Sequence, residues 1–310
     1  MDILIPSVAN RHFLRGIRPY KGLMDQIQSY GRCLVVLNIQ ELTDLKIEDI
    51  RKNWAIKNRD VETDVRLWDS QAEDPTYHHI YDDFLKLLEQ EHMLDKNFDV
   101  LDIGCGVGIY SIALAEGVHT VTGLDIAPKM IAHGNRMMGE SNMDNISFEL
   151  MDWNTVDLAQ KGMRERYDLV FAHNTPAICD VDTFEKFNDA SRRFCAVCSP
   201  IRMVEPVMQQ IQEMTDCNIK GTSCDSNFSY MLDILLHKGY SPKLHYEKQT
   251  WPMNQSFEDA CSYYLGRIMT EKQISESETA DVKEYLRSLV RDGIISDQIN
   301  ATVATMYWEK

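Results

Sequence analysis

The segment VLDIGCGVG, residues 100–108, decides the fold of this chain. It opens with three large apolar side chains and one aspartate, a pattern typical of a buried strand. Three glycines follow at alternate positions, and glycine lets a turn adopt positive φ and lets a ligand approach the backbone closely. The residues from Ile109 to Glu116 then show a helical pattern. Strand, glycine turn and helix together predict a βα unit whose turn binds a ligand.

The spacing of the glycines separates two kinds of nucleotide-binding turn. A dinucleotide fold places its third glycine three residues after the second, where this chain has Ile109. Here the spacing is Gly104-x-Gly106-x-Gly108, with Asp102 ahead of the first glycine. This arrangement resembles the D/E-x-G-x-G-x-G signature of class I S-adenosylmethionine-dependent methyltransferases. The resemblance implies that Asp102 and the glycine turn hold the methionine moiety of S-adenosylmethionine, whose ammonium group suits a carboxylate.

Two further aspartates follow the next predicted strands. Asp125 ends one strand and Asp152 follows the other, and open parallel sheets bind ligands at this carboxyl edge. The resemblance implies that Asp125 accepts hydrogen bonds from both ribose hydroxyls and that Asp152 accepts one from the adenine amine. Ile126 or Trp153 is then expected to pack on the adenine ring. A single aspartate in such a place is equally a helix N-cap, but three in this order and spacing favour a cofactor site.

Apolar runs alternate with helical patterns from Phe98 onward, which is typical of βαβ units. The predicted strands are residues 99–103, 119–125, 146–151, 167–172, 194–198, 243–250 and 301–308. We therefore expect an α/β fold with a doubly wound, mostly parallel seven-stranded sheet of the class I methyltransferase type. The predicted domains are an N-terminal accessory or cap region at residues 1–95 and a Rossmann-like domain at residues 96–310. Two insertions are predicted within the Rossmann-like domain, at residues of about 200–227 and about 256–292.

The accessory region precedes the residues that the nucleotide-binding fold requires. Ile80, Phe84, Leu87 and Leu88 follow a helical spacing, so one face of this helix is expected to pack on the sheet domain. In related enzymes such a region often covers the pocket, which makes Trp68, Asp69, His78 and His79 weak site candidates. Residues 1–60 fit either a cap or the contact of a homodimer, and the need to exclude water from methyl transfer favours the cap.

The loop after the fourth strand, His173 to Ala177, is where the acceptor is expected to bind. It only half resembles the Asn-Pro-Pro-Tyr motif of amino-group methyltransferases, because Thr175 and Ala177 replace two of its residues. This departure argues against DNA base methylation. His173 lies at the catalytic edge with an ordinary pKa near neutrality, so it is the candidate general base and a cofactor neighbour. A histidine here equally often bonds only its own loop. Asn174 is expected to orient the acceptor or the cofactor.

The cysteines are best explained as free thiols. Eight of them are scattered without the regular spacing of a disulfide framework. Cys105 lies in the glycine turn and is grouped with the cofactor-binding residues. Cys195 and Cys198 invite comparison with arsenic-methylating enzymes of the family, but residues three apart on a strand point to opposite faces. The sequence therefore predicts structural thiols and no metal site.

Charge and hydropathy limit the partners of this chain. The 310 residues include 48 acidic and 32 basic side chains, giving a formal net charge of −16. A surface of this sign repels phosphate backbones, so we expect no nucleic-acid partner. No apolar stretch reaches the length of a membrane span, and residues 1–30 lack a signal-peptide pattern. The sequence therefore predicts a cytoplasmic protein without a membrane partner.

Three functions remain open at this point. The favoured one is a methyltransferase that acts on a small-molecule acceptor, because the accessory region and the second insertion are long enough to enclose one. The alternatives are a methyltransferase acting on RNA or protein, and a regulatory protein that binds the cofactor without turnover. Fold similarity alone does not identify the acceptor.

Overall fold

The computed structural model describes residues 2–4, 36–55, 59–73, 82–141, 143–217, 226–269 and 271–310. They form two compact units, Met1–Trp54 and Ala55–Lys310. In the first unit, β1 (Asp2–Leu4) pairs antiparallel with β2 (Val36–Asn38), and α2 (Ile39–Asn53) follows. The second unit contains every residue predicted for the site. His78 and His79 lie outside the described residues.

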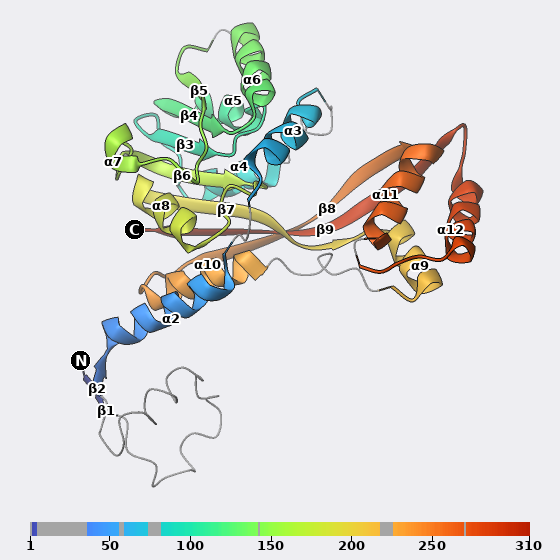
Figure 1. The fold of residues 1–310 in the computed structure, drawn as a ribbon. Helices are drawn as coiled ribbons and strands as arrows, with labels where there is room; N and C mark the ends of the chain where they lie inside the picture. Colours follow the sequence, from blue (N-terminus) through green and yellow to red (C-terminus); the bar gives the residue numbers. More distant parts are fainter. Residues whose placement is uncertain are drawn as a thin grey trace. The chain divides into compact units, whose positions relative to one another are not determined.

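The second unit is built on a seven-stranded sheet in the order β5-β4-β3-β6-β7-β9-β8 (Figure 1). Five strands are parallel, and β9 runs antiparallel to both of its neighbours. The order reverses between β3 and β6, and open α/β sheets bind ligands at such a switch point. The predicted α/β fold with a mostly parallel sheet is thereby confirmed. The strands in chain order are β3 (Asp99–Ile103), β4 (Thr120–Asp125), β5 (Ile146–Leu150), β6 (Tyr167–His173), β7 (Ser191–Val204), β8 (Lys243–Ser256) and β9 (Ile294–Glu309).

Helices cover both faces of the sheet. On one face, α4 (Asp82–Gln90) and α5 (Ile109–Ala115) pack on a core whose members include Phe84, Leu88, Tyr110, Leu169 and Phe171. The predicted packing of α4 on the sheet is therefore confirmed. On the other face, α8 (Val181–Ala190) places Phe184 and Phe187 against Trp308 of β9. The remaining helices include α6 (Pro128–Ser141), α7 (Leu158–Lys161) and α10 (Ser226–His237).

The last three strands are much longer than the sequence predicts. The predicted strand ended at residue 198, two residues before Pro200, yet β7 continues through this proline to Val204. The reason lies in the pairing: β6 ends at His173, whose partner is Cys198, so β7 beyond that point is paired only with β9. A proline without an N–H group is tolerated on such a free side. Pro252 is tolerated likewise, because β8 is the edge strand.

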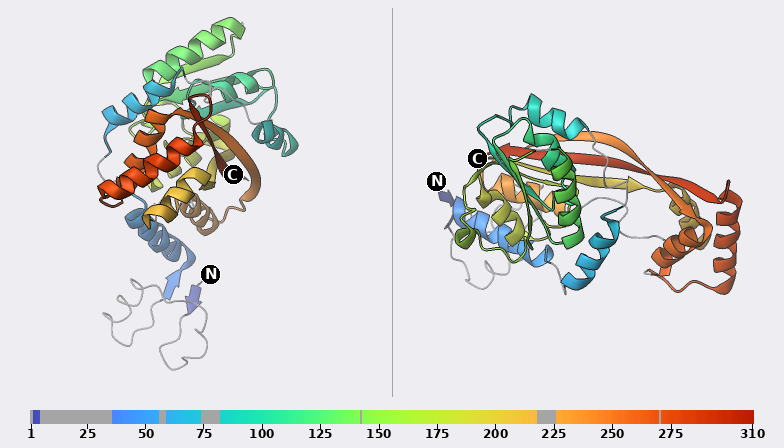
Figure 2. Two further views of the ribbon diagram at one scale, coloured as in Figure 1. Left: turned by 90° about the vertical axis from the view of Figure 1, so that its right-hand side faces the viewer. Right: turned by 90° about the horizontal axis from the view of Figure 1, so that it is seen from above.

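These long strands lead to a separate group of helices, which we call the helical head. It consists of α9 (Pro206–Thr215), α11 (Phe257–Met269) and α12 (Glu276–Leu289). Figure 2 shows the head at the far end of β8 and β9. Its own apolar core includes Met208, Ile211, Tyr264, Val282 and Leu286. The stretch predicted as a second helical insertion thus contains α11 and α12.

A buried ion pair joins α9 to α11. Glu205 is only 5% exposed, and both of its carboxylate oxygens accept hydrogen bonds from Nη1 of Arg267, at 2.6 and 2.7 Å. The hydroxyl of Tyr263 donates to the same carboxylate at 3.0 Å. Burial, and then the adjacent Glu205 charge, raises the pKa of Tyr263 to about 12. Tyr263 is therefore protonated and acts as a donor.

The segment ahead of the sheet belongs to the same compact unit as the sheet. Helix α3 (Val61–Gln71) packs beside α6, and Trp68 and Ala72 join an apolar cluster that includes Val107 of the glycine turn. The compact units divide after Trp54, whereas the sequence placed a domain boundary near residue 95. Packing of α3 and α4 on the sheet domain is the physical reason for this difference. Within the described residues, no helix combines the length and the apolar character needed to cross a membrane.

Candidate functional site

The glycine turn connects β3 to α5 at the switch point of the sheet. All three of its glycines have left-handed backbones, with φ of +68° at Gly104, +55° at Gly106 and +77° at Gly108. The backbone N–H groups of Gly104 and Cys105 donate to the carbonyl of Leu124, which ties the turn to β4. The turn that the sequence predicted is therefore present at the edge where ligands bind.

The three glycines are needed for different reasons. A Cβ at Gly104 would lie 1.9 Å from Oγ1 of Thr175, and one at Gly108 would lie 2.1 Å from Phe148. Packing within the protein therefore excludes a side chain at both positions. At Gly106 the nearest atom to such a Cβ is Sδ of Met130, at 4.0 Å. The space beside Gly106 is open, as a turn that admits a ligand requires.

Asp125 stands next to this opening at the end of β4. Its carboxylate accepts hydrogen bonds from the backbone N–H groups of Gly106 and Ala127, at 2.9 and 2.8 Å. Burial raises the pKa of Asp125, and these backbone donors only partly oppose the rise. Because each carboxylate oxygen accepts more than one hydrogen bond, both oxygens retain capacity for the two hydroxyls of a ribose.

Asp102 lies below the turn on β3 and is only 2% exposed. It accepts a hydrogen bond of 2.7 Å from Oγ of Ser111 on α5. Burial raises the pKa of Asp102 to about 7 despite this bond. Near neutral pH the carboxyl group is therefore balanced between its charged and neutral forms. A cationic group beside it would favour the charged form.

Asp152 has a partner that the sequence did not reveal. Nη1 of Arg59 donates to both carboxylate oxygens of Asp152, at 2.9 and 2.7 Å. Burial would raise the pKa of Asp152, but the hydrogen bonds and charge of Arg59 outweigh it and lower the pKa. Arg59 precedes α3 in a polar stretch that carries no motif. Only the fold brings it to the predicted adenine carboxylate.

The two candidates for packing on adenine differ in accessibility. Trp153 is 3% exposed, and its indole N–H donates to the carbonyl of Thr183 at 3.1 Å. Its ring is therefore fixed within the protein core. Ile126, directly after Asp125, is half-buried and keeps part of its side chain at the surface. The geometry thus favours Ile126 for this contact.

His173 ends β6 between two aromatic rings. Its ring centroid lies 4.1 Å from that of Tyr110 and 4.9 Å from that of Phe84. Burial lowers the pKa of His173 to about 3, so the imidazole is neutral at physiological pH. Asn174 follows in a left-handed conformation, with φ of +55°, and its side chain is exposed. Thr175 then contacts Gly104, which joins this loop to the glycine turn.

Helix α3 adds a cover beside the turn. Asp69 accepts a hydrogen bond of 2.8 Å from the backbone N–H of Lys129 and so caps the start of α6. Trp68 packs near Val107 and Met130. Both residues were weak candidates from the sequence, and the structure places them next to the glycine turn. Here they hold the cover in position.

The cysteine pair on β7 is divided between the two faces of the sheet. Cys195 pairs with Trp308, which contacts α8, whereas Cys198 belongs to the core beneath α4. The predicted opposite orientation is confirmed. Burial raises the pKa of both thiols to about 12, so both remain protonated. Among the described residues, no three His, Cys, Asp or Glu side chains converge on a point that would hold a metal ion.

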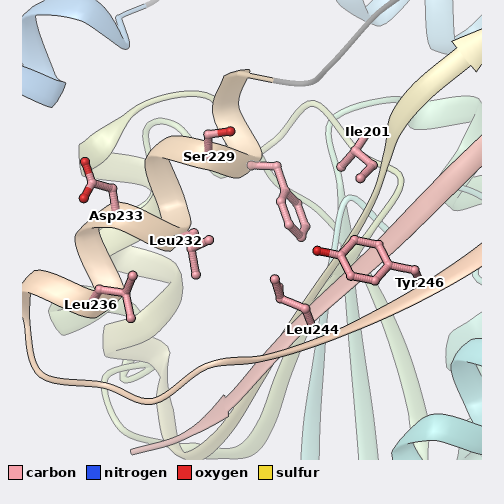
Figure 3. Close-up of a pocket in the computed structure, with 8 residues that line it drawn as sticks. Ile201, Ser229, Leu232, Asp233, Leu236, Leu244 and Tyr246 are labelled. Atoms are coloured by element: carbon pink, nitrogen blue, oxygen red, sulfur yellow. The ribbon is translucent and has the colours of Figure 1, made fainter.

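An apolar groove of about 290 Å³ lies elsewhere, between α10 and the sheet (Figure 3). Leu232 and Leu236 line it from the helix, and Leu244 and Tyr246 from β8. His245 of β8 is aligned with His173 across the sheet, through the paired residues Cys198 and Thr305. Side chains alternate between the two faces along a strand, so the odd-numbered residues of β8 lie on the face of His173 and the even-numbered residues lie on the opposite face. The sheet therefore separates the groove from His173.

A model of the family described as "Methyltransferase domain" matches residues 94–287, which is more than half of the chain. The chain belongs to this family. The glycine turn with Asp102 and Asp125 suits the predicted cofactor, S-adenosylmethionine. The predictions of the family and of the cofactor are confirmed.

Individual relatives match only part of the chain. The 2-heptyl-1-hydroxyquinolin-4(1H)-one methyltransferase of Mycobacteroides abscessus is 39% identical over 70 residues, covering 23% of this chain and 30% of that protein. The ribosomal protein L11 methyltransferase of Lactobacillus johnsonii is 36% identical over 90 residues, covering 29% of this chain and 27% of that protein. The chain thus spans less than a third of the length of these curated relatives.

Among solved structures, phosphoethanolamine N-methyltransferase 2 of Haemonchus contortus, in complex with S-adenosyl-L-methionine, has a TM-score of 0.49 and 15% identity. The match covers 83% of this chain and 60% of that chain. By their names, the two curated relatives act on a small molecule and on a ribosomal protein, so they do not point to a single class of acceptor.

Proposed function

We propose that this protein transfers the methyl group of S-adenosylmethionine to a small-molecule acceptor. The observation that carries the proposal is the open space beside Gly106, a left-handed glycine next to the carboxylate of Asp125. When bound, the cofactor supplies an electrophilic methyl group on a sulfonium centre, which an acceptor attacks in line. What remains for the protein is to bind, orient and exclude water.

Binding and orientation fall to the residues at the edges of β3 and β4. Asp125 would accept from the ribose hydroxyls, since its oxygens keep accepting capacity beyond the bonds to Gly106 and Ala127. Asp102 lies beneath the turn, where an ionised carboxylate would favour the ammonium group. Helix α3, fixed on α6 by Asp69, would limit the access of water from one side.

For His173 the structure favours an orienting role over that of a base. With a pKa of about 3, the imidazole has little tendency to take up a proton at neutral pH. A neutral ring still has one nitrogen that donates and one that accepts a hydrogen bond. We therefore assign His173 to positioning the acceptor, with Asn174 next to it on the exposed loop.

The acceptor class follows from charge and enclosure. A net charge of −16 disfavours an RNA acceptor, and the long strands with the helical head extend from the carboxyl edge of β7, beyond His173. Such a wall suits a small molecule better than a flat macromolecular surface. A cytoplasmic location, a homodimer and a cap formed by residues 1–60 stay predictions.

The test of this function replaces Gly106 and measures cofactor affinity. Gly106→Ala places a Cβ in the open space and in a left-handed backbone, so S-adenosylhomocysteine should bind at least about tenfold more weakly in calorimetry. Gly139→Ala is the matched control, because nothing lies within 4 Å of a Cβ there and Gly139 is on α6. Equal affinity of the folded Gly106 variant and the wild type would contradict the proposed cofactor site.

A further inference from the structure

One face of the sheet carries a row of polar side chains that the cofactor site does not use. His173 on β6 pairs with Cys198 on β7, Cys198 with Thr305 on β9, and Thr305 with His245 on β8. Paired residues share a face, and side chains alternate along each strand. Glu247 and Gln249, which follow His245 at alternate positions on β8, therefore lie on the face of His173.

Buried atoms in this row lack hydrogen-bond partners. Nε2 of His173, Oε1 of Glu247 and Nε2 of Gln249 are enclosed, and within the described part of the chain none of these atoms is paired. The buried Thr305 hydroxyl also has no hydrogen-bond partner within the described residues, and it lies beside the weakly polar thiol of Cys198. Burying one such polar atom unpaired costs about 1–3 kcal/mol. Several of them on one face indicate a place built to receive hydrogen bonds from another molecule.

The chemistry of each atom is defined by its surroundings. The carbonyl oxygen of Gln249 accepts the indole N–H of Trp251 at 2.7 Å, so its amide nitrogen is the free atom and a donor. Glu247 offers a carboxylate oxygen, which takes a hydroxyl or amine donor. His173 is neutral and offers a single ring nitrogen. We refer to His173, Glu247, Gln249 and Thr305 together as the polar strip.

Apolar side chains surround the polar strip on the same face. Ala301 pairs with Gln249, Val303 pairs with Glu247, and Met203 and Trp251 pack against the same core. From β6 to β8 the strip crosses three strand spacings, about 14 Å, which matches the length of a small metabolite. At the β6 end lies His173, whose loop contacts the glycine turn through Thr175.

We infer that the polar strip is the acceptor subsite, and that the acceptor is a mainly apolar small molecule bearing a hydroxyl or amine for Glu247 and a carbonyl or ring nitrogen for Gln249. This inference rests on the proposed methyltransferase function. The long strands explain why the subsite is present: β8 and β9 continue past the level of His173 and so provide the floor. A sheet that ended with β6 would lack it.

The test separates acceptor binding from cofactor binding. The purified full chain is incubated with S-adenosylmethionine labelled at the methyl group and with the small-molecule fraction of a cell extract. Glu247→Gln and Gln249→Glu keep the shape of each side chain and reverse or remove its polarity, so each should lower label transfer at least about tenfold. Calorimetry with S-adenosylhomocysteine should give wild-type affinity for both. Lys248→Ala is the control, since this exposed residue points to the opposite face of β8.

Each outcome decides between the two proposals. If the wild type labels no small molecule, the proposed function fails and this inference fails with it. If the wild type transfers label and both variants match it, the inference alone is wrong; loss of cofactor affinity in both variants also rejects it. Should the variants not fold, a crystal structure of the wild type with S-adenosylhomocysteine decides. Ordered water or acceptor on Nε2 of Gln249 and Nε2 of His173 is expected, whereas pairing of both atoms with protein side chains would overturn the subsite.

Discussion

The two halves of the sheet differ in strand length and in what they carry. Strands β3 to β6 have 5–7 residues each, whereas β7, β8 and β9 have 14, 14 and 16. The short strands end together at one edge and carry the glycine turn and the three aspartates. The long strands continue past that edge and carry the helical head and all members of the polar strip except His173, which ends β6. Under the proposed function, the short half would bind the cofactor, and the long half together with His173 would bind the acceptor.

This division predicts that damage to the helical head leaves the cofactor half intact. Arg267→Met removes the charged partner of Glu205, whose carboxylate is nearly fully buried. An uncompensated buried charge should destabilise the protein by about 3 kcal/mol. Chemical denaturation measures this loss, and S-adenosylhomocysteine affinity should stay unchanged.

A matched double variant sharpens that comparison. Glu205→Leu combined with Arg267→Met removes both charges, so it should recover part of the lost stability. If the single variant weakened cofactor binding as strongly as it reduced stability, the two halves would not be independent.

The second prediction addresses the cofactor half alone. Asp125→Ala removes the acceptor of two ribose hydrogen bonds, so affinity for S-adenosylhomocysteine should fall about 100-fold, or about 2.7 kcal/mol. The same substitution also frees the N–H of Gly106, so circular dichroism should first establish that the variant folds. An affinity within threefold of wild type would remove Asp125 from the site.

The third and smallest effect is a pH dependence of cofactor affinity. Because burial raises the pKa of Asp102 to about 7, the ionised fraction rises roughly tenfold between pH 6 and pH 8. S-adenosylhomocysteine affinity should rise by up to that factor over the same interval, and Asp102→Asn should remove most of the rise. A wild-type affinity that is flat from pH 6 to pH 8 would show that Asp102 does not pair with the ammonium group.

The same carboxyl group should make the free protein less stable as the pH rises. Its pKa is higher in the folded protein than in the unfolded chain, so the stability it contributes is fully present below about pH 3.8 and is lost as the pH rises through about 7. Thermal unfolding of wild type and Asp102→Asn at pH 5 and pH 8 measures this contribution. Between pH 5 and pH 8 the free energy of unfolding of the wild type should fall more, or rise less, than that of Asp102→Asn; equal changes in the two proteins would contradict the raised pKa of Asp102.

The sequence by itself determined the cofactor half. Glycine spacing and the carboxylates at the ends of β3 and β4 are local patterns, because the backbone geometry of a tight turn and the chemistry of a strand end are encoded within a few residues. Strand positions were predicted for the same reason, since apolar runs mark buried parallel strands. These elements fixed the family, the fold class and the cofactor.

Only the tertiary structure decided three other features: the length of β7, the partner of Asp152 and the surroundings of His173. The continuation of β7 past Pro200 depends on where β6 ends, and β6 lies far from Pro200 in the chain. The pairing of Arg59 with Asp152 joins residues 93 positions apart, and no local pattern marks it. The low pKa of His173 arises from burial between Phe84 and Tyr110. Such properties depend on which distant side chains exclude water from a residue, and that is fixed only when the chain has folded.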